Sequence, residues 1–345
     1  MKYIVELPTE SARKISRLIS EGKYESISQF AATAIENQLL LEGSIEEKID
    51  KVLGKKLTRK VSFDKSKEFN QKRLLSLDFT TKDIKTVSAP TSDRIPNDVL
   101  WGQYNRIFPI KITIRVLANL LVRNDTAELS FLQSEAIRAA REIGIVLKRK
   151  DEEQDRKYGN MLSSALPTGK SIIKAEKRFT NHFVGYLTRA GRIEGAPGAL
   201  KLLNIFEDVN GAYRVGITDA GLAFASLENP VIDREQFDTT LGKGERDFYV
   251  KHVSENLQRE TEAVVTVLRG IEDGASSPDE LNSRIGTFSR GWSKTMTNTI
   301  RAGIVGRLHE LGLLTRSRNG IRVSYALTDY GRAVLNSFQE RSDVS

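Results

Sequence analysis

The sequence predicts a mainly α-helical protein with small β elements, in the α+β class. Helical spacing of apolar residues recurs through most of the chain, and a short apolar strand stands at its start. An Asn-Gly pair between two short apolar runs, the strongest short-range signal for a β-hairpin, occurs at Asn210-Gly211 and again at Asn319-Gly320, about 110 residues later. A repeat at a fixed interval predicts two similar domains.

The composition is that of a globular protein with room for two or three domains. The chain has 345 residues, of which 39% are hydrophobic and 28% charged, and its formal net charge is +8. It contains no cysteine, which excludes disulfides and thiolate chemistry, and its three histidines have no metal-ligand spacing. No apolar stretch reaches membrane-spanning length. We therefore expect a cytoplasmic protein with no membrane association, no metal and no other cofactor.

The first forty residues contain one strand and two amphipathic helices. The strand covers residues 3–7, the first helix residues 11–20, and the second helix begins at Ser26 or Ser28 and runs to about Leu41. One strand and two helices cannot bury a core alone, and an unpaired strand needs a partner. Residues 1–43 are therefore expected to form a homodimer whose strands pair across a two-fold axis.

The order strand, Leu-Pro-x-Glu, helix, Gly-x-Tyr-x-Ser-x-Ser-x-Phe, helix over residues 2–41 resembles the ribbon–helix–helix family of Arc-type and methionine-repressor-type proteins. The resemblance implies that paired strands enter the DNA major groove, with alternate residues facing the bases. It also implies a phosphate contact at the N-terminus of the second helix. Glu6 departs from the basic character of the family, and the alternative is that this module only dimerises the protein. The implied DNA-contacting residues are Lys2, Ile4, Glu6, Ser26 and Ser28.

Residues 44–99 are interpreted as a basic linker. From residue 44 to residue 110 the chain contains fourteen Lys or Arg and nine Asp or Glu. Apolar residues are scattered there, and residues 88–96 have the composition of a loop. Such a tract can follow a DNA backbone, although a plain solvated linker would carry the same charge.

The first repeat domain is expected over residues 100–232. Helical spacing predicts helices over residues 111–123, 128–147 and 170–188, followed by the hairpin at Asn210-Gly211. Acidic residues flank that turn, at Glu207 and Asp208, so this hairpin is poorly suited to contact phosphate.

The second repeat domain is expected over residues 233–345. We predict a long helix over residues 247–271, a short one over 278–285 and a third over 293–311, followed by the hairpin at Asn319-Gly320. Basic residues flank this second hairpin. Its charge is therefore opposite to that of the first.

In both repeats, a helix leads into the hairpin, and a Thr-Asp pair then caps a closing helix, which is the pattern of the C-terminal half of a winged helix. The string Leu308-His309-Glu310-Leu311-Gly312-Leu313-Leu314, the basic hairpin and Leu-Thr-Asp-x-Gly-Arg over residues 327–332 resemble the winged-helix regulator superfamily. The resemblance implies the fold and identifies no single activity.

The second winged helix is the better candidate for DNA binding, because polar and basic side chains occupy the first turns of its third helix and its hairpin. Asn298 and Arg301 lie one to two turns into that helix and are the candidates for base readout. The expected DNA-contacting residues of this domain are Ser293, Lys294, Thr295, Thr297, Asn298 and Arg301 on the helix, and Arg316, Arg318 and Arg322 on the hairpin.

The sequence contains no pattern typical of an enzyme. Residues 166–171, Leu-Pro-Thr-Gly-Lys-Ser, are similar to the end of a phosphate-binding loop, but Ser164 stands where the motif requires its first glycine. No Ser/His/Asp set and no pair of histidine ligands is evident. We therefore expect a non-catalytic protein.

The expected function is sequence-specific binding of double-stranded DNA by a homodimer that regulates transcription and associates with the nucleoid. The alternative is a non-catalytic accessory subunit whose tandem winged helices bind DNA or dock onto a protein partner in a DNA-processing, chromosome-maintenance or defence complex. The acidic first hairpin favours this alternative, whereas the basic second hairpin favours the regulator. Direct DNA binding weakens steeply with salt, and protein docking need not.

Overall fold

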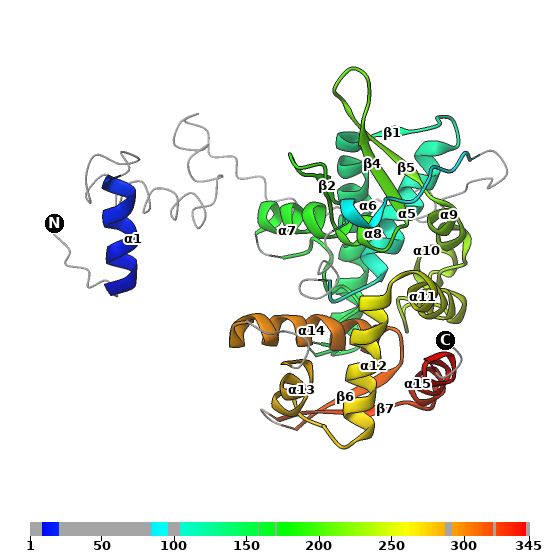
Figure 1. The fold of residues 1–345 in the computed structure, drawn as a ribbon. Helices are drawn as coiled ribbons and strands as arrows, with labels where there is room; N and C mark the ends of the chain where they lie inside the picture. The colour runs from blue at the N-terminus through cyan, green and yellow to red at the C-terminus, as the bar shows by residue number, and fades with distance from the viewer. Residues whose placement is uncertain are drawn as a thin grey trace, which may run out of the picture. The chain divides into compact units, whose positions relative to one another are not determined.

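The computed structural model describes residues 9–20, 84–95, 104–157, 159–169, 171–286, 292–319 and 322–342 (Figure 1). The chain divides into two units, Met1–Lys67 and Glu68–Ser345. The element described in the first unit is α1 (Thr9–Ser20), which confirms the helix predicted there. The predicted N-terminal strand and the second predicted helix of that module lie outside the described residues.

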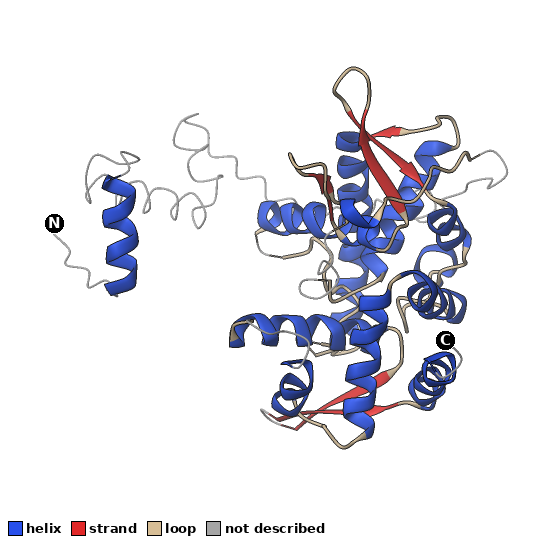
Figure 2. Ribbon diagram, in the orientation of Figure 1, coloured by secondary structure: helices blue, strands red, loops and turns tan. Residues whose placement is uncertain are grey.

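The second unit is mainly helical and contains small antiparallel sheets, which confirms the α+β class (Figure 2). We call residues 104–234 its first lobe and residues 243–342 its second lobe. The elements of the first lobe are α5 (Phe108–Leu121), β1 (Ala127–Glu128), α6 (Leu129–Glu153), α7 (Ile172–Phe179), the π-helical turn η3 (Thr180–Val184), β2 (Tyr186–Leu187), β3 (Ile193–Glu194), α8 (Ala196–Ala199), β4 (Leu203–Glu207), β5 (Tyr213–Ile217), α9 (Asp219–Ser226) and α10 (Pro230–Arg234).

The main sheet of the first lobe has the strand order β1-β5-β4, and all its strands are antiparallel. Val215 in the central strand pairs with Ala127 on one side and Ile205 on the other, and all three residues are buried. The sheet therefore packs one apolar face onto the helices of the lobe, and the hairpin predicted around Asn210-Gly211 is confirmed as β4–β5.

The second lobe repeats this order of elements in a simpler form. Between α12 (Gln258–Glu272) and α13 (Pro278–Ile285), the carbonyl of Ser276 accepts a hydrogen bond from the Tyr325 N–H at 2.9 Å, in the place that β1 has in the first lobe. The predicted hairpin is confirmed as β6–β7. The elements are α11 (Lys243–Asn256), α12 (Gln258–Glu272), α13 (Pro278–Ile285), α14 (Lys294–Glu310), β6 (Leu314–Asn319), β7 (Arg322–Leu327) and α15 (Asp329–Ser342).

The repeated Thr-Asp-x-Gly sequence forms the same junction in both lobes. The Thr218 hydroxyl accepts from the Gly221 N–H at 3.0 Å and donates to the Lys201 carbonyl at 2.7 Å. The Thr328 hydroxyl likewise accepts from the Gly331 N–H at 2.9 Å and donates to the Gly312 carbonyl at 2.7 Å. The threonine thus caps the closing helix and ties it to the turn before the hairpin.

Glycine is required three residues after each of these threonines. A Cβ at Gly221 would clash with the Leu202 carbonyl, and a Cβ at Gly331 would clash with the Leu313 carbonyl. The closing helix therefore crosses the start of the hairpin at backbone contact, which explains why the repeat is visible in the sequence.

The helix that precedes each hairpin also ends in the same way. The Leu202 N–H donates to the Pro197 carbonyl and the Leu313 N–H to the Leu308 carbonyl, five residues back in each case. The residue before each of them has a left-handed backbone, with φ of 55° at Lys201 and 72° at Gly312. The one-turn helix α8 is therefore the counterpart of the last turn of α14.

Two predicted helices differ from the structure. The helix predicted over residues 247–271 is two helices, because the backbone of Leu257 leaves the helical region at φ −137° and ψ 74°. The third helix predicted for the first domain, over residues 170–188, is α7 followed by η3 and a strand. It ends at Gly185, whose φ is 102° and whose α-carbon lies against the Glu194 carbonyl.

Part of the predicted linker packs on the first lobe. The Val87 N–H donates to the Ile217 carbonyl at 2.8 Å, and Ile84 is buried. At the end of the short 3-10 turn η2 (Ser92–Arg94), Arg94 donates to the side chain of Asn204 at 3.1 Å. Residues 84–95, which include η2 (Ser92–Arg94), therefore belong to the structure of this lobe.

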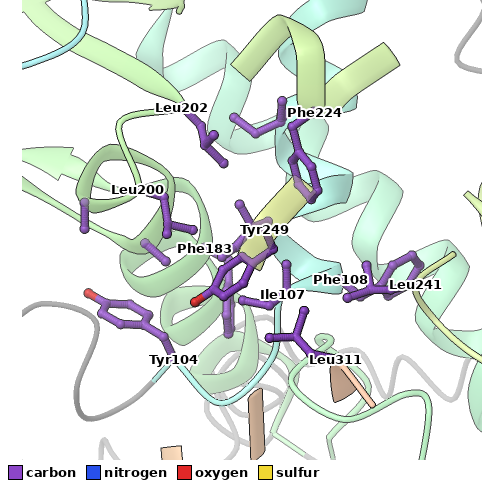
Figure 3. Packing of buried hydrophobic residues seen from close by; sticks show 14 of the residues in the cluster. Tyr104, Ile107, Phe108, Phe183, Leu200, Leu202, Phe224, Leu241, Tyr249 and Leu311 are labelled. Carbon is purple, nitrogen blue, oxygen red and sulfur yellow. The ribbon is translucent and has the colours of Figure 1, made fainter. Parts of the chain in front are cut away.

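The two lobes share one core. Tyr104, Ile107 and Phe108 of the first lobe lie in the same packed cluster as Tyr249 and Leu311 of the second (Figure 3). Buried polar contacts join the same segments: Arg307 donates to the Tyr104 carbonyl, and the Glu310 carboxylate accepts from the Ile107 N–H. The C-terminal part of α14 is therefore embedded between the lobes.

Candidate nucleic-acid interface

Helix α14 has a polar, exposed beginning. The hydroxyl of Ser293, where the helix was predicted to begin, accepts from the Met296 N–H at 3.2 Å and caps the helix. Lys294 and Thr295 are exposed in the first turn, and Thr297 is partly exposed. The backbone N–H groups at this end and the Lys294 ammonium group form a local positive region suited to a phosphate or to base-edge acceptors.

The two candidate base readers form a hydrogen-bonded network with neighbouring elements. Asn282 of α13 donates to the Asn298 side-chain oxygen at 2.7 Å and accepts from Arg301 Nε at 3.0 Å. Arg301 Nη1 also donates to the Tyr325 hydroxyl at 3.2 Å. Both side chains are partly exposed, so the network orients them while leaving donors for a ligand.

The three arginines predicted on the hairpin do not lie on one face. Arg316 and Arg318 share the face that carries Tyr325 and Leu327, whereas Arg322, paired with Asn319, points to the other face. Arg318 and Arg322 are exposed near the turn. The tip of this hairpin can therefore present positive charge on both of its faces.

Arg316 instead borders a cleft between the lobes. Its guanidinium group lies against the α-carbon of Gly159, and the cleft, of about 740 Å³, is also lined by Arg106, Arg301 and His309. Sequence reasoning missed Arg106 and His309 as functional candidates. About 200 residues separate them in the chain, and no local motif joins them.

The cleft places a partly buried histidine beside two of its arginines. Burial, followed by the nearby charges of Arg106 and Arg316, lowers the pKa of His309 from 6.5 to about 4. His309 is therefore neutral at pH 7. Arg106 is held beside it by a hydrogen bond of 2.9 Å to the Gly159 carbonyl.

The lowered pKa of His309 predicts that acid weakens the fold. As the pH falls from about 6.5 toward 4, the unfolded chain binds a proton that the folded chain does not, so the free energy of unfolding decreases. Since the side chain is partly exposed, we expect a contribution of roughly 1–2 kcal/mol. Urea unfolding at several pH values should show that the free energy of unfolding decreases less with falling pH in His309→Gln than in the unmodified protein. Identical pH profiles for the two proteins would contradict this account of the cleft.

The hairpin of the first lobe has different chemistry. Asp208 accepts from the backbone N–H groups of Asn210 and Ala212, so its carboxylate shapes the turn. Arg214 donates to the carbonyl of Thr126 at 2.9 Å and thereby joins β5 to the residue before β1. The helix turn before this hairpin, α8, is buried. The exposed Lys174, Lys177 and Arg178 of this lobe lie on α7, which η3, β2, β3 and α8 separate from the hairpin.

The most strongly buried charge cluster in the first lobe is structural. Lys111 is fully buried, donates to the Phe224 and Leu227 carbonyls at 2.6 and 2.7 Å, and pairs with Glu245 at 3.0 Å. Burial, opposed in part by Glu245, lowers the pKa of Lys111 to about 8. Because the amine already has these acceptors, it anchors the end of α9.

Several predicted positions lie outside the described residues: Lys2, Ile4, Glu6, Ser26 and Ser28. Within the described part of the chain, no group of three potential metal ligands occurs, and no helix is both long and apolar enough to cross a membrane. No protein-family model, curated protein or solved structure matches the chain.

Proposed function

We propose that the protein binds double-stranded DNA sequence-specifically and regulates transcription, with α14 and the β6–β7 hairpin as the principal contact surface. The charge of this segment carries the proposal. From Trp292 to Leu327 the chain has six Lys or Arg and one acid, Glu310, which is turned into the core. Only one of the six, Arg307, is consumed by a buried ion pair. Lys294 lies at the exposed start of α14, Arg318 and Arg322 lie near the hairpin tip, and Arg301 and Arg316 border the cleft.

The order of elements supports a winged-helix arrangement for the second lobe. Helix α12, the bridging residue Ser276, α13, α14 and the β6–β7 hairpin follow one another as in that fold. In such an arrangement, the start of α14 enters the major groove and the hairpin contacts the adjacent backbone. The first lobe has the same order with insertions before its hairpin, and we propose it as a second, modified winged helix.

We propose further that residues 1–43 form a ribbon–helix–helix module that makes the protein a homodimer. The sequence pattern and α1 support this assignment. Two copies of α14 in one dimer would suit an operator with two half-sites.

Removing the N-terminal unit is expected to yield a monomer. A chain that begins at Glu68 keeps residues 84–95, which pack on the first lobe, and lacks the predicted dimerisation strand. Light scattering should give the dimer mass for the full chain and the monomer mass for the shortened chain. A shortened chain that remains dimeric would place self-association elsewhere.

Base readout is expected to depend on Asn298 and Arg301. Asn298→Ala or Arg301→Ala should relax the preference at particular base pairs by about 1–3 kcal/mol, while nonspecific binding changes little. The measurement is selection of bound fragments from random DNA, followed by titration of the selected sequence.

Arg332→Ala is the matched control for this experiment, since Arg332 is an exposed residue of α15 that pairs with Asp329. Its selected sequence should equal that of the unmodified protein. If the Asn298 and Arg301 variants also select the same sequence with the same affinity, α14 does not read bases. A Lys2→Ala variant then tests readout by the N-terminal strands.

One observation favours the alternative of a protein-docking subunit. The β4–β5 hairpin carries Glu207 and Asp208 beside the fully exposed Val209, a combination suited to a protein surface and unsuited to phosphate. An accessory subunit could dock through this hairpin. Its association with a partner should then be lost on Val209→Asp while DNA binding is retained.

A further inference from the structure

The charged side chains that line the cleft between the lobes are all basic among the described residues. Its charged and titratable residues are Arg106, Arg301, Arg316, His309 and Tyr325, and no described aspartate or glutamate lines it. Three guanidinium groups in one cleft without a described carboxylate produce an excess of positive charge.

The guanidinium groups keep donors available inside the cleft. No described residue accepts a hydrogen bond from Arg316, although its guanidinium group is partly buried against Gly159. Arg106 uses Nη2 on the Gly159 carbonyl, and Arg301 uses Nε and Nη1 within the network around Asn282. Each arginine has five N–H donors in a planar group that matches phosphate and carboxylate oxygens.

Small residues of α14 make the space for a ligand. Ala302, Gly303 and Gly306 line the cleft along one stripe of the helix. Gly306 also allows the Asn105 backbone to pack against α14, since a Cβ there would lie 2.8 Å from the Asn105 carbonyl. The resulting volume of about 740 Å³ lies within the range of small-molecule sites, roughly 300–1,000 Å³. A DNA duplex is too wide to enter a space of this size, whereas a metabolite fits.

We propose that this cleft is a binding site for a small phosphorylated anion. Arg316 and Arg106 bind its oxygens from opposite lobes, and Arg301 contributes from α14. Because Asn298 and Arg301 also belong to the proposed DNA surface, an occupant would reposition those side chains and change DNA affinity. This regulatory consequence rests on the proposed function, whereas the binding site itself does not.

Inorganic pyrophosphate is the probe for the site, titrated by calorimetry into the full-length protein at constant ionic strength. We expect saturable binding with one site per chain. Arg316→Gln and Arg106→Gln should each weaken it at least tenfold, whereas Arg332→Gln, which removes the same charge from an exposed position on α15, should leave it unchanged. Equal loss in all three variants, or no saturable binding to the unmodified protein, would overturn the proposal.

A variant that fills the cleft distinguishes binding at a defined site from nonspecific attraction to positive charge. Ala302 lines the cleft and is exposed, so Ala302→Leu fills space without removing charge or disturbing the core. Pyrophosphate binding should again weaken at least tenfold, with an unchanged thermal unfolding midpoint. Retention of full affinity would contradict binding inside the cleft.

The pH dependence gives a second readout. His309 faces Arg106 and Arg316 across the cleft, and Arg301 lies two turns earlier on α14, while Glu310 is turned toward Ile107 and Thr240. A bound anion offsets the nearby positive charge and favours protonation of His309. Between pH 7.5 and 5.5 the unmodified protein should therefore gain at least threefold in affinity relative to His309→Gln. Protonation of pyrophosphate itself affects both proteins equally. If the affinity of His309→Gln changes with pH as much as that of the unmodified protein, His309 does not lie beside the bound anion.

Titration of duplex DNA by the same variants distinguishes the possible sources of phosphate. If pyrophosphate does not bind and Arg316→Gln reduces the salt dependence of DNA binding, the cleft belongs to the duplex interface and the proposal fails. If pyrophosphate binds as expected and duplex DNA does not bind, the site stands and the proposed function fails.

Discussion

Replacing Arg307 by alanine is expected to destabilise the protein by about 3–5 kcal/mol, because it leaves the buried Glu260 carboxylate without its partner. Arg307 is 1% exposed and donates to both oxygens of Glu260, at 3.0 and 2.9 Å. It also donates to the Tyr104 carbonyl of the first lobe. Urea unfolding of the full chain, followed by circular dichroism, measures the loss.

Two further variants define the origin of this effect. Arg332→Ala removes an exposed ion pair on α15 and should cost less than about 1 kcal/mol. The double variant Arg307→Met with Glu260→Met removes both buried charges and should recover much of the lost stability. The double variant also deprives the buried Tyr249 hydroxyl of its acceptor, since that hydroxyl donates to Glu260 at 2.8 Å. If the double variant is as unstable as Arg307→Ala, the loss arises from packing, from the Tyr104 contact or from this hydroxyl.

Removing the two arginines at the tip of the second hairpin is expected to weaken DNA binding at every sequence. Arg318 and Arg322 are exposed on opposite faces near the turn, where each can contact a phosphate. The Arg318→Ala, Arg322→Ala variant should reduce the salt slope of binding by up to roughly two, since each lost phosphate contact releases about one counterion fewer.

The first hairpin provides the comparison for this variant. Arg214 is engaged with Thr126 beside the acidic turn, so Arg214→Ala should leave the salt slope unchanged. A slope that is unaffected in the double variant would exclude the β6–β7 hairpin from the DNA interface. An equal reduction in Arg214→Ala would show that overall charge, and not this hairpin, sets the slope.

Local signals in the sequence predicted the repeated parts of the fold. Both Asn-Gly hairpins are present, and Thr218 and Thr328 cap the closing helices as predicted. These features depend on a few adjacent residues whose preferences are intrinsic: turn residues between apolar runs, and a hydroxyl that accepts a backbone N–H. The short helix predicted over residues 278–285 is also present, and in the structure Ser277 and Glu280 form a capping box at its start.

Features that depend on distant contacts were not predictable from the sequence. The break at Leu257 lies within an apolar pattern that continues on both sides, so periodicity alone indicates one helix. The buried polar residues of α14, Arg307 and Glu310, have the composition of a solvated helix face, and only contacts with Glu260 and Ile107 account for their burial. Arg316 was predicted as part of a basic hairpin. It borders the cleft because its guanidinium group packs against Gly159 of the first lobe, about 157 residues earlier in the chain.

The most direct test of the central proposal is the salt dependence of binding between the full-length protein and a DNA duplex selected from random sequence. The logarithm of the association constant should fall linearly with the logarithm of salt concentration. We expect a slope of several units, because α14, the β6–β7 hairpin and their copies in a dimer each neutralise phosphates. A slope near zero, or affinity for the selected duplex no greater than for an unrelated one, would contradict the account.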